Sequence, residues 1–101
     1  MITVIASISV KEPYLNDFLA IFKNNIAAVL QEDGCIEYYP TIDLPTDIGP
    51  QQQDSRIVTI IEKWESVEQL NMHLIAPHML EYRKATDHMV EGVTLKILQA
   101  A

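Results

Sequence analysis

The sequence predicts an α+β fold in which helices cover one face of an antiparallel sheet. Four stretches rich in strand-forming residues lie at residues 1–10, 35–42, 56–64 and 93–99. Apolar residues spaced three and four positions apart, which are typical of helices, lie between the first and second stretches and between the third and fourth. The resulting order, β-α-β-β-α-β, is the ferredoxin-like arrangement.

The first strand and the first helix have the clearest patterns. Alternate residues of the first stretch share one face of the predicted strand, namely Ile2, Val4, Ala6, Ile8 and Val10. Apolar residues at offsets of three and four then predict a helix over about residues 14–32. Pro13 suits the first helical position, and Gly34 suits the end of the helix.

The third predicted strand is apolar on both faces. One face carries Ile57, Thr59 and Ile61, and the other carries Val58, Ile60 and Trp64. Helices of the same chain can cover only one face of the sheet, so we expect a second copy of the chain to cover the other. Pro40 favours an edge position for the second strand. The polar, proline-containing loop at residues 43–54 is long enough to suggest a function of its own.

The segment between the last two strands carries two of the three histidines. Ser66 and Gln69 match a capping box, which begins a short helix that runs to about residue 75. Pro77 interrupts that helix and begins another over residues 77–90. His73 and His78 lie five positions apart, whereas two ligands on one helix face lie three or four apart. We therefore do not expect a metal site here.

Length and composition predict one domain over residues 1–101 with a hydrophobic core. The formal net charge of −7 argues against nucleic acid and anionic membranes as partners. The single cysteine, Cys35, excludes an intrachain disulfide and a thiolate metal cluster. The first ten residues have no basic segment and are too short for a signal peptide, so the cytoplasm is the expected compartment.

Three short motifs carry a resemblance to a known family: "EDGCIEYY" after the first helix, "EKWES" after the third strand, and "LNMHLIAPHM". Over essentially its whole length the chain resembles the antibiotic biosynthesis monooxygenase (ABM) family, and within it the quinol monooxygenase branch. The matching positions are Trp64, Glu65 and Ser66 in one motif, and His73, Leu74, Pro77 and His78 in another.

The resemblance implies a dimeric α/β barrel in which two ferredoxin-like units pack sheet to sheet. It also implies an apolar pocket between the sheet and the helices of each subunit. Members that act as oxygenases oxidise quinols or anthrones with O₂ and need no bound metal or flavin. We therefore expect a cofactor-independent monooxygenase that oxidises a quinol or similar hydroxylated aromatic.

The family also contains members with other activities, which the sequence narrows only in part. Haem-degrading relatives have an asparagine on the first strand, where this chain has Ala6 and Ser7, and a tryptophan at the position of His73. Haem cleavage is therefore not expected. An isomerase or other proton-transfer enzyme acting on a small, possibly phosphorylated, carbonyl compound is the alternative, with Arg83 and Lys84 as the nearby basic pair. A homodimer that only binds a small molecule is the third hypothesis.

For the leading function, we expect His73 or His78 to be the catalytic base. His73 lies near a helix C-terminus, where the dipole favours the charged form, and His78 near a helix N-terminus, where it favours the neutral form. If both face one cavity, the neutral imidazole could take the quinol proton. The alternative is that both histidines hydrogen-bond the backbone around Pro77.

Four aromatic residues are the candidates for substrate binding. We expect Trp64, Tyr38 and Tyr82 to orient the ring of the substrate, and Phe22 to exclude water from it. Each has an alternative: Trp64, Tyr38 and Phe22 could serve packing alone, and Tyr82 could be a partly exposed helix residue.

Overall fold

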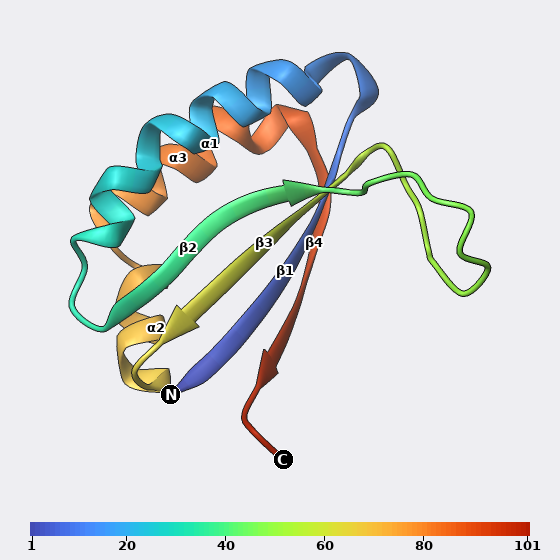
Figure 1. Cartoon of the computed structure of the whole chain (residues 1–101). Coiled ribbons are helices and arrows are strands. Elements are labelled where there is room, and N and C mark those ends of the chain that lie inside the picture. The colour runs from blue at the N-terminus through green and yellow to red at the C-terminus, as the bar shows by residue number, and fades with distance from the viewer.

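The computed structural model describes residues 1–101 and confirms the predicted ferredoxin-like order of elements (Figure 1). Four strands form one sheet in the order β2-β3-β1-β4, and every neighbouring pair is antiparallel. Short 3₁₀ helices at Glu12–Tyr14 and Asp87–Met89 precede α1 and β4. The strands and α-helices are β1 (Ile2–Val10), α1 (Leu15–Leu30), β2 (Cys35–Ile42), β3 (Ile57–Trp64), α2 (Val67–Leu74), α3 (Pro77–Thr86) and β4 (Val90–Leu98).

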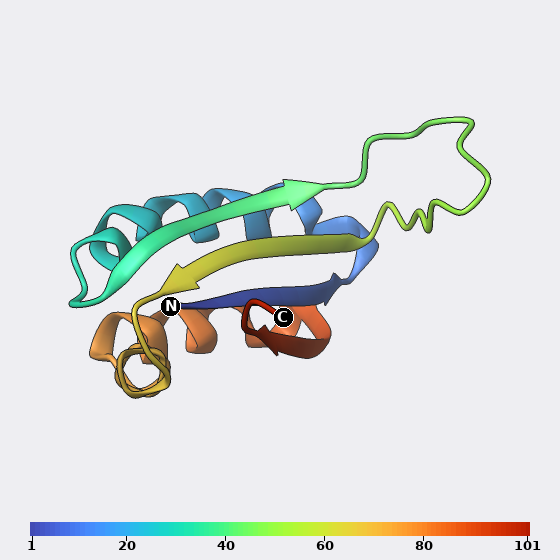
Figure 2. The same cartoon turned by 60° about the horizontal axis from the view of Figure 1, so that its bottom comes forward.

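The helices cover one face of the sheet, and the core lies between the two layers (Figures 1 and 2). Because side chains alternate along a strand, the even-numbered residues of β1 and β3 point toward the helices. All of them except the partly buried Ile2 are buried: Val4, Ala6, Ile8 and Val10 from β1, and Val58, Ile60, Glu62 and Trp64 from β3. The alternation predicted for both strands is confirmed, with one unexpected charged residue, Glu62.

Helix α1 buries a stripe of side chains against the sheet. Phe18, Phe22 and Val29, spaced at four and seven positions, are fully or nearly fully buried. Pro13 lies in the 3₁₀ turn rather than at the first position of the α-helix. After the helix, Gly34 adopts a φ of 82°, a left-handed conformation that reverses the chain into β2.

The two short helices follow their predicted signals. Ser66 caps α2 and accepts a hydrogen bond from the backbone nitrogen of Gln69. Pro77 is the first residue of α3, and Ala76 before it is extended, as a residue that precedes proline should be. This break turns the chain between the positions of His73 and His78.

The predicted bounds of the last helix and strand are wrong. Helix α3 ends at Thr86 rather than residue 90, and β4 begins at Val90 rather than residue 93. Gly92 therefore lies inside the strand, opposite Ser9 of β1, next to an irregularity in the pairing. The ladder with β1 extends the strand past a glycine that local preference would have placed before it.

Two regions lie outside the core between the layers. The loop between β2 and β3 extends away from the sheet (Figures 1 and 2), and its own hydrogen bonds hold it, including one from the Asp54 nitrogen to Asp43 Oδ2.

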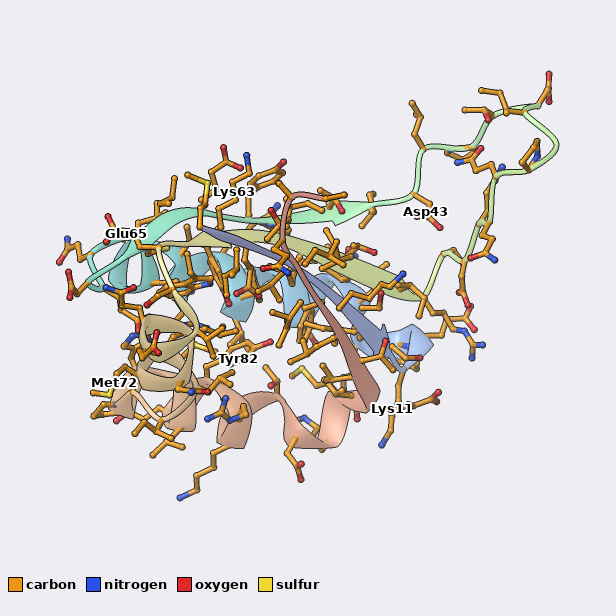
Figure 3. The ribbon with its side chains drawn as sticks, turned by 90° about the horizontal axis from the view of Figure 1, so that it is seen from below. Lys11, Asp43, Lys63, Glu65, Met72 and Tyr82 are labelled. Atoms are coloured by element: carbon orange, nitrogen blue, oxygen red, sulfur yellow. The ribbon has the colours of Figure 1, made fainter.

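Strand β2 lies at a sheet edge, as Pro40 predicted. The face of the sheet that carries the odd-numbered residues of β1 and β3 has no helix over it, and Lys63 points away from the helices (Figure 3). None of the helices combines the length and the apolar character that crossing a bilayer requires.

The conformation of Gly34 generates the first prediction. A Cβ atom at this position would lie 2.5 Å from Gln69 Cδ, and the left-handed φ is unfavourable for any residue with a side chain. We expect Gly34→Ala to lower the free energy of unfolding by about 1–2 kcal/mol, measured by urea denaturation. Gly49→Ala is the control, because nothing lies within 4 Å of its added methyl group. Equal stability of the two variants would contradict this account.

Candidate active site

A cavity of about 260 Å³ lies between the sheet and the helices, and 11 of its 16 lining residues are hydrophobic. All four strands and all three α-helices contribute side chains to it. The cavity holds few polar groups, so each of them has a defined position against an apolar background. The side chains with polar groups are Glu62, His73, Arg83, Thr86 and Asp87, together with Tyr38 and Tyr82, which are also counted among the hydrophobic residues.

Aromatic side chains form one part of the cavity wall. The Tyr38 ring stacks on Phe22 with centroids 5.3 Å apart, and Tyr82 meets Phe22 edge-on at 5.8 Å. Tyr82 reaches from α3 into the space between helices and sheet (Figure 3). Burial raises the pKa of both tyrosines far above the ordinary value, so both stay neutral and can act as hydrogen-bond donors but not as bases.

His73 is the only imidazole on the cavity wall. It lies in the last turn of α2, it is 2% exposed, and its ring is 4.7 Å from that of Trp64. Its Nδ1 lies 2.7 Å from Oε2 of Glu32, which follows α1. No protein group hydrogen-bonds Nε2, so Nε2 is the nitrogen available to a ligand.

Burial decides the charge of His73. It lowers the pKa of the imidazole below the ordinary value of 6.5, and it outweighs the hydrogen bond and the charge of Glu32, which act in the opposite direction. The preference for the charged form that a helix C-terminus confers is likewise overcome. At neutral pH the Nδ1–H donates to Glu32, and Nε2 carries a lone pair that can accept a proton.

Glu62 is a second titratable group on the cavity wall, and the sequence analysis missed it. It is 5% exposed, and Trp64 Nε1 donates its one side-chain hydrogen bond, to Oε1 at 2.9 Å. Burial is the main cause that raises its pKa from 4.5 to about 7, and the hydrogen bond from Trp64 partly offsets it. The carboxyl group is therefore close to half protonated at neutral pH.

Two predicted site residues lie outside the cavity wall. Trp64 is completely buried in the core and reaches the site through its hydrogen bond to Glu62 and through the His73 ring that it packs against. His78 lines a separate surface hollow between α1 and α3, because the break at Pro77 turns it toward α1. The expectation that both histidines face one cavity is therefore not met. The structure brings together His73, Tyr38, Tyr82 and Phe22.

The two carboxylates differ in how a sequence could reveal them. Glu62 occupies an inward position of β3 between Ile60 and Trp64, so a charged residue in a buried register was a signal that could have found it. Glu32 follows the first helix among other acidic residues, and nothing local distinguishes it. No group of three or more His, Cys, Asp or Glu side chains is arranged to hold a metal ion.

The arrangement suits proton transfer in an apolar setting. A neutral imidazole whose Nδ1 is held by a carboxylate keeps one tautomer, and the lone pair of its Nε2 has no protein partner. The apolar wall removes water from a flat ligand and strengthens the electrostatic interactions around it.

Comparisons with known proteins agree with this fold and identify a family. The family model described as "Antibiotic biosynthesis monooxygenase" matches residues 1–85. The chain is 34% identical over 101 residues to "Probable quinol monooxygenase YgiN" of Escherichia coli K12, which covers 98% of this chain and 97% of that protein.

Solved structures show the same fold. A conserved protein from Methanosarcina mazei Go1 superposes with a TM-score of 0.84 at 24% identity, covering 99% of this chain and 92% of that one. A crystal structure of an antibiotic biosynthesis monooxygenase superposes with a TM-score of 0.83 at 20% identity, covering 100% and 99%.

The buried Glu62 carboxyl group generates a prediction on stability. Its raised pKa means that the folded state binds the proton more tightly than the unfolded chain, so stability present below pH 4.5 is lost as the pH rises through 7. Glu62→Gln removes that loss and can keep the bond from Trp64. As the pH rises from about 4 to about 8, we expect the free energy of unfolding of the variant to increase by about 3 kcal/mol relative to that of the wild type.

Urea denaturation of both proteins across this pH range makes the comparison. The difference between the two isolates the Glu62 carboxyl from all other titrating groups. Glu65→Gln, at an exposed position just beyond β3, is the control for the loss of one negative charge. A difference between wild type and Glu62→Gln that stays constant with pH would rule out the raised pKa.

Proposed function

The chain belongs to the antibiotic biosynthesis monooxygenase family, and from that premise we propose that it oxidises a quinol or similar hydroxylated aromatic with O₂, without a bound cofactor. The family supports a monooxygenase acting on a small molecule. The observation that supports the finer proposal is the neutral His73, held by Glu32, on the wall of a mostly apolar cavity.

The proposed reaction begins with proton removal. Nε2 of His73 accepts the proton of a substrate hydroxyl, and the resulting anion is electron-rich enough to give an electron to O₂. One oxygen atom then enters the ring and the other leaves as water, so that one quinol and one O₂ give one hydroxyquinone and one water. The protein contributes the base, the orientation of the ring and a dry setting.

Glu62 suits the second half of this reaction. Release of the second oxygen as water requires a proton as the O–O bond breaks. A carboxyl group with a pKa near 7 holds a proton for part of the time and can donate it. We assign that role to Glu62, with Trp64 positioning it through the bond to Oε1.

The aromatic residues fit the binding of a flat substrate. The stacked pair of Tyr38 and Phe22 and the edge-on Tyr82 offer ring faces and edges to an aromatic ligand. Both tyrosine hydroxyls stay protonated and can donate to an oxygen of the substrate.

An isomerase on a phosphorylated carbonyl compound is the second candidate, and one observation favours it. Arg83 is the only basic residue on the cavity wall, where a phosphate would need one. Its guanidinium already donates to the backbone oxygen of Leu74, and Lys84 lies outside the cavity. The apolar character of the rest of the wall favours the aromatic substrate.

The proposed functional unit is a homodimer. On the uncovered face of the sheet, Ile61 lies across from Ile5 on one side and from Tyr39 on the other, which makes an apolar row over three strands. A second copy of the chain, packed sheet to sheet, would cover this row.

Oxygen uptake tests the proposed activity. Metal-stripped protein is mixed with freshly reduced quinols, and uptake is compared with a protein-free blank because quinols autoxidise. We expect saturable uptake, with kcat lowered about 100-fold or more in His73→Gln because the base is lost. His88→Gln is the matched control, since His88 lies outside the cavity.

Uptake that matches the blank across the panel would refute the oxygenase. Loss of a labelled substrate proton to solvent without oxygen consumption would then support the isomerase. Saturable binding with no turnover would leave a binding protein.

Light scattering tests the dimer. We expect a dimer for the wild type and a monomer for Ile61→Lys. Dimerisation would bury the lysine charge in the apolar row with no opposite charge or hydrogen-bonding group to compensate it. Ile75→Lys is the control, since Ile75 is exposed after α2, on the helix side of the sheet. A monomeric wild type would refute the dimer.

A further inference from the structure

We propose that His73, Glu32 and His78 form a proton relay that carries the substrate's proton from the cavity to the surface hollow between α1 and α3. The proposal rests on the proposed function, because the proton in question is the one that His73 removes. It gives a role to His78, which lies outside the cavity wall.

The three side chains meet at one oxygen atom. Glu32 Oε2 lies 2.7 Å from His73 Nδ1 and 3.2 Å from His78 Nε2. The exposed fraction of the side chains increases in the same order along the chain of contacts: 2% for His73, 16% for Glu32 and 27% for His78. The carboxylate therefore contacts both a buried imidazole on the cavity wall and a partly exposed one in the hollow.

The surroundings of His78 decide which of its nitrogens is free. The amide nitrogen of Asn25 donates to Met79 Sδ at 3.3 Å, which directs Asn25 Oδ1 toward His78 Nδ1 at 3.1 Å. Because that oxygen can only accept, Nδ1 of His78 carries a hydrogen. In neutral His78 the other nitrogen, Nε2, is therefore unprotonated.

Nε2 of His78 is the one buried side-chain nitrogen or oxygen atom without a hydrogen-bond partner. Glu32 Oε2 is 3.2 Å away but lies off the bonding direction of the ring nitrogen, so their closeness is not a hydrogen bond in the resting protein. Buried polar atoms usually have partners, and an orphaned one needs an explanation. A vacant acceptor that takes a proton from the carboxylate during turnover provides it.

The transfers balance without any movement of electrons. His73 Nε2 gains the substrate proton, and the hydrogen on His73 Nδ1 passes to Glu32 Oε2. That proton passes to His78 Nε2, which makes an imidazolium. The imidazolium ring then turns away, releases the Nε2 hydrogen to water in the hollow and turns back, which restores the Nδ1–H tautomer of His78.

His73 now holds its hydrogen on Nε2. It returns to the Nδ1–H form when that hydrogen passes to Glu62, which has given its own proton to the departing oxygen, and a proton comes back along the relay to Nδ1. Over a whole turnover as many protons return as leave, as a reaction that releases no proton requires.

Other charged groups border the relay. The charge of Arg83 disfavours protonation of His73 from the cavity side. Glu81 lies in the hollow with His78 and Asn25, where a negative charge attracts a departing proton. Both effects favour movement of the proton outward.

Chemical rescue tests the relay in the whole protein. We expect His78→Ala in dilute buffer to lower kcat roughly tenfold with little change in KM, because only proton release is slowed. Added imidazole should restore kcat and should not affect His88→Ala, the matched control. A purely structural role for His78 would not be rescued. A kcat in His78→Ala that is unchanged, or lowered without rescue, would overturn the proposal.

Imidazole nitrogen NMR provides a readout that needs no turnover. We expect Nδ1–H tautomers for both His73 and His78, and nitrogen shifts of His73 that respond to protonation of His78. The response should vanish in Glu32→Gln, and independent titrations in the wild type would overturn the relay. Oxygen uptake without rescue refutes the relay alone. No uptake for any quinol, with linked titrations intact, refutes the oxygenase and leaves the proton path supported.

Discussion

The hydrogen bond between His73 and Glu32 is the interaction on which the proposed site depends. It joins the last turn of α2 to the segment after α1, and the two residues are 41 positions apart in the chain. It selects the tautomer of the imidazole and leaves Nε2 as the nitrogen without a protein partner. Around it, Trp64 and Tyr38 pack on the ring, so the base is held by contacts on several sides.

Burial shifts the pKa values of His73 and Glu62, the proposed base and acid, in opposite directions with one result. It raises the pKa of Glu62 and lowers that of His73, so that both groups favour their neutral forms. A cavity with few charges suits a neutral aromatic substrate and makes a newly formed anion reactive, because little solvent or counter-charge stabilises it. The acid and base assignments follow from environment rather than from residue type.

The two faces of the sheet have different roles in this protein. The face toward the helices carries the core and the cavity, and it accommodates the buried carboxyl of Glu62 because Trp64 provides a hydrogen bond. The other face has no helix over it and carries the apolar row around Ile61. A sheet with helices on one side leaves its other side available for association, so the proposed dimer would not obstruct the cavity on the helix side.

Much of the fold could be predicted from local patterns, because those patterns have local causes. The alternation in β1, the helical stripe through Phe18 and Phe22, the cap at Ser66 and the break at Pro77 each follow from a few neighbouring residues. The start of β4 could not be predicted, since pairing with β1 carries the strand past Gly92. The aromatic candidates Tyr38 and Tyr82 and the cavity position of His73 were likewise within reach of periodicity and motif.

The side chains that contact these residues could not be predicted from local patterns. Glu32 lies next to His73 only because the end of α1 and the end of α2 converge in space, and no spacing in the sequence encodes that contact. The separation of His73 from His78 also arises in three dimensions, from the direction in which α3 leaves Pro77. The sequence by itself determined the order of the elements, the buried faces and the family, because hydrophobic periodicity and short motifs are local. Only the tertiary structure decided which side chains share a proton, because a hydrogen bond depends on distances between segments far apart in the chain.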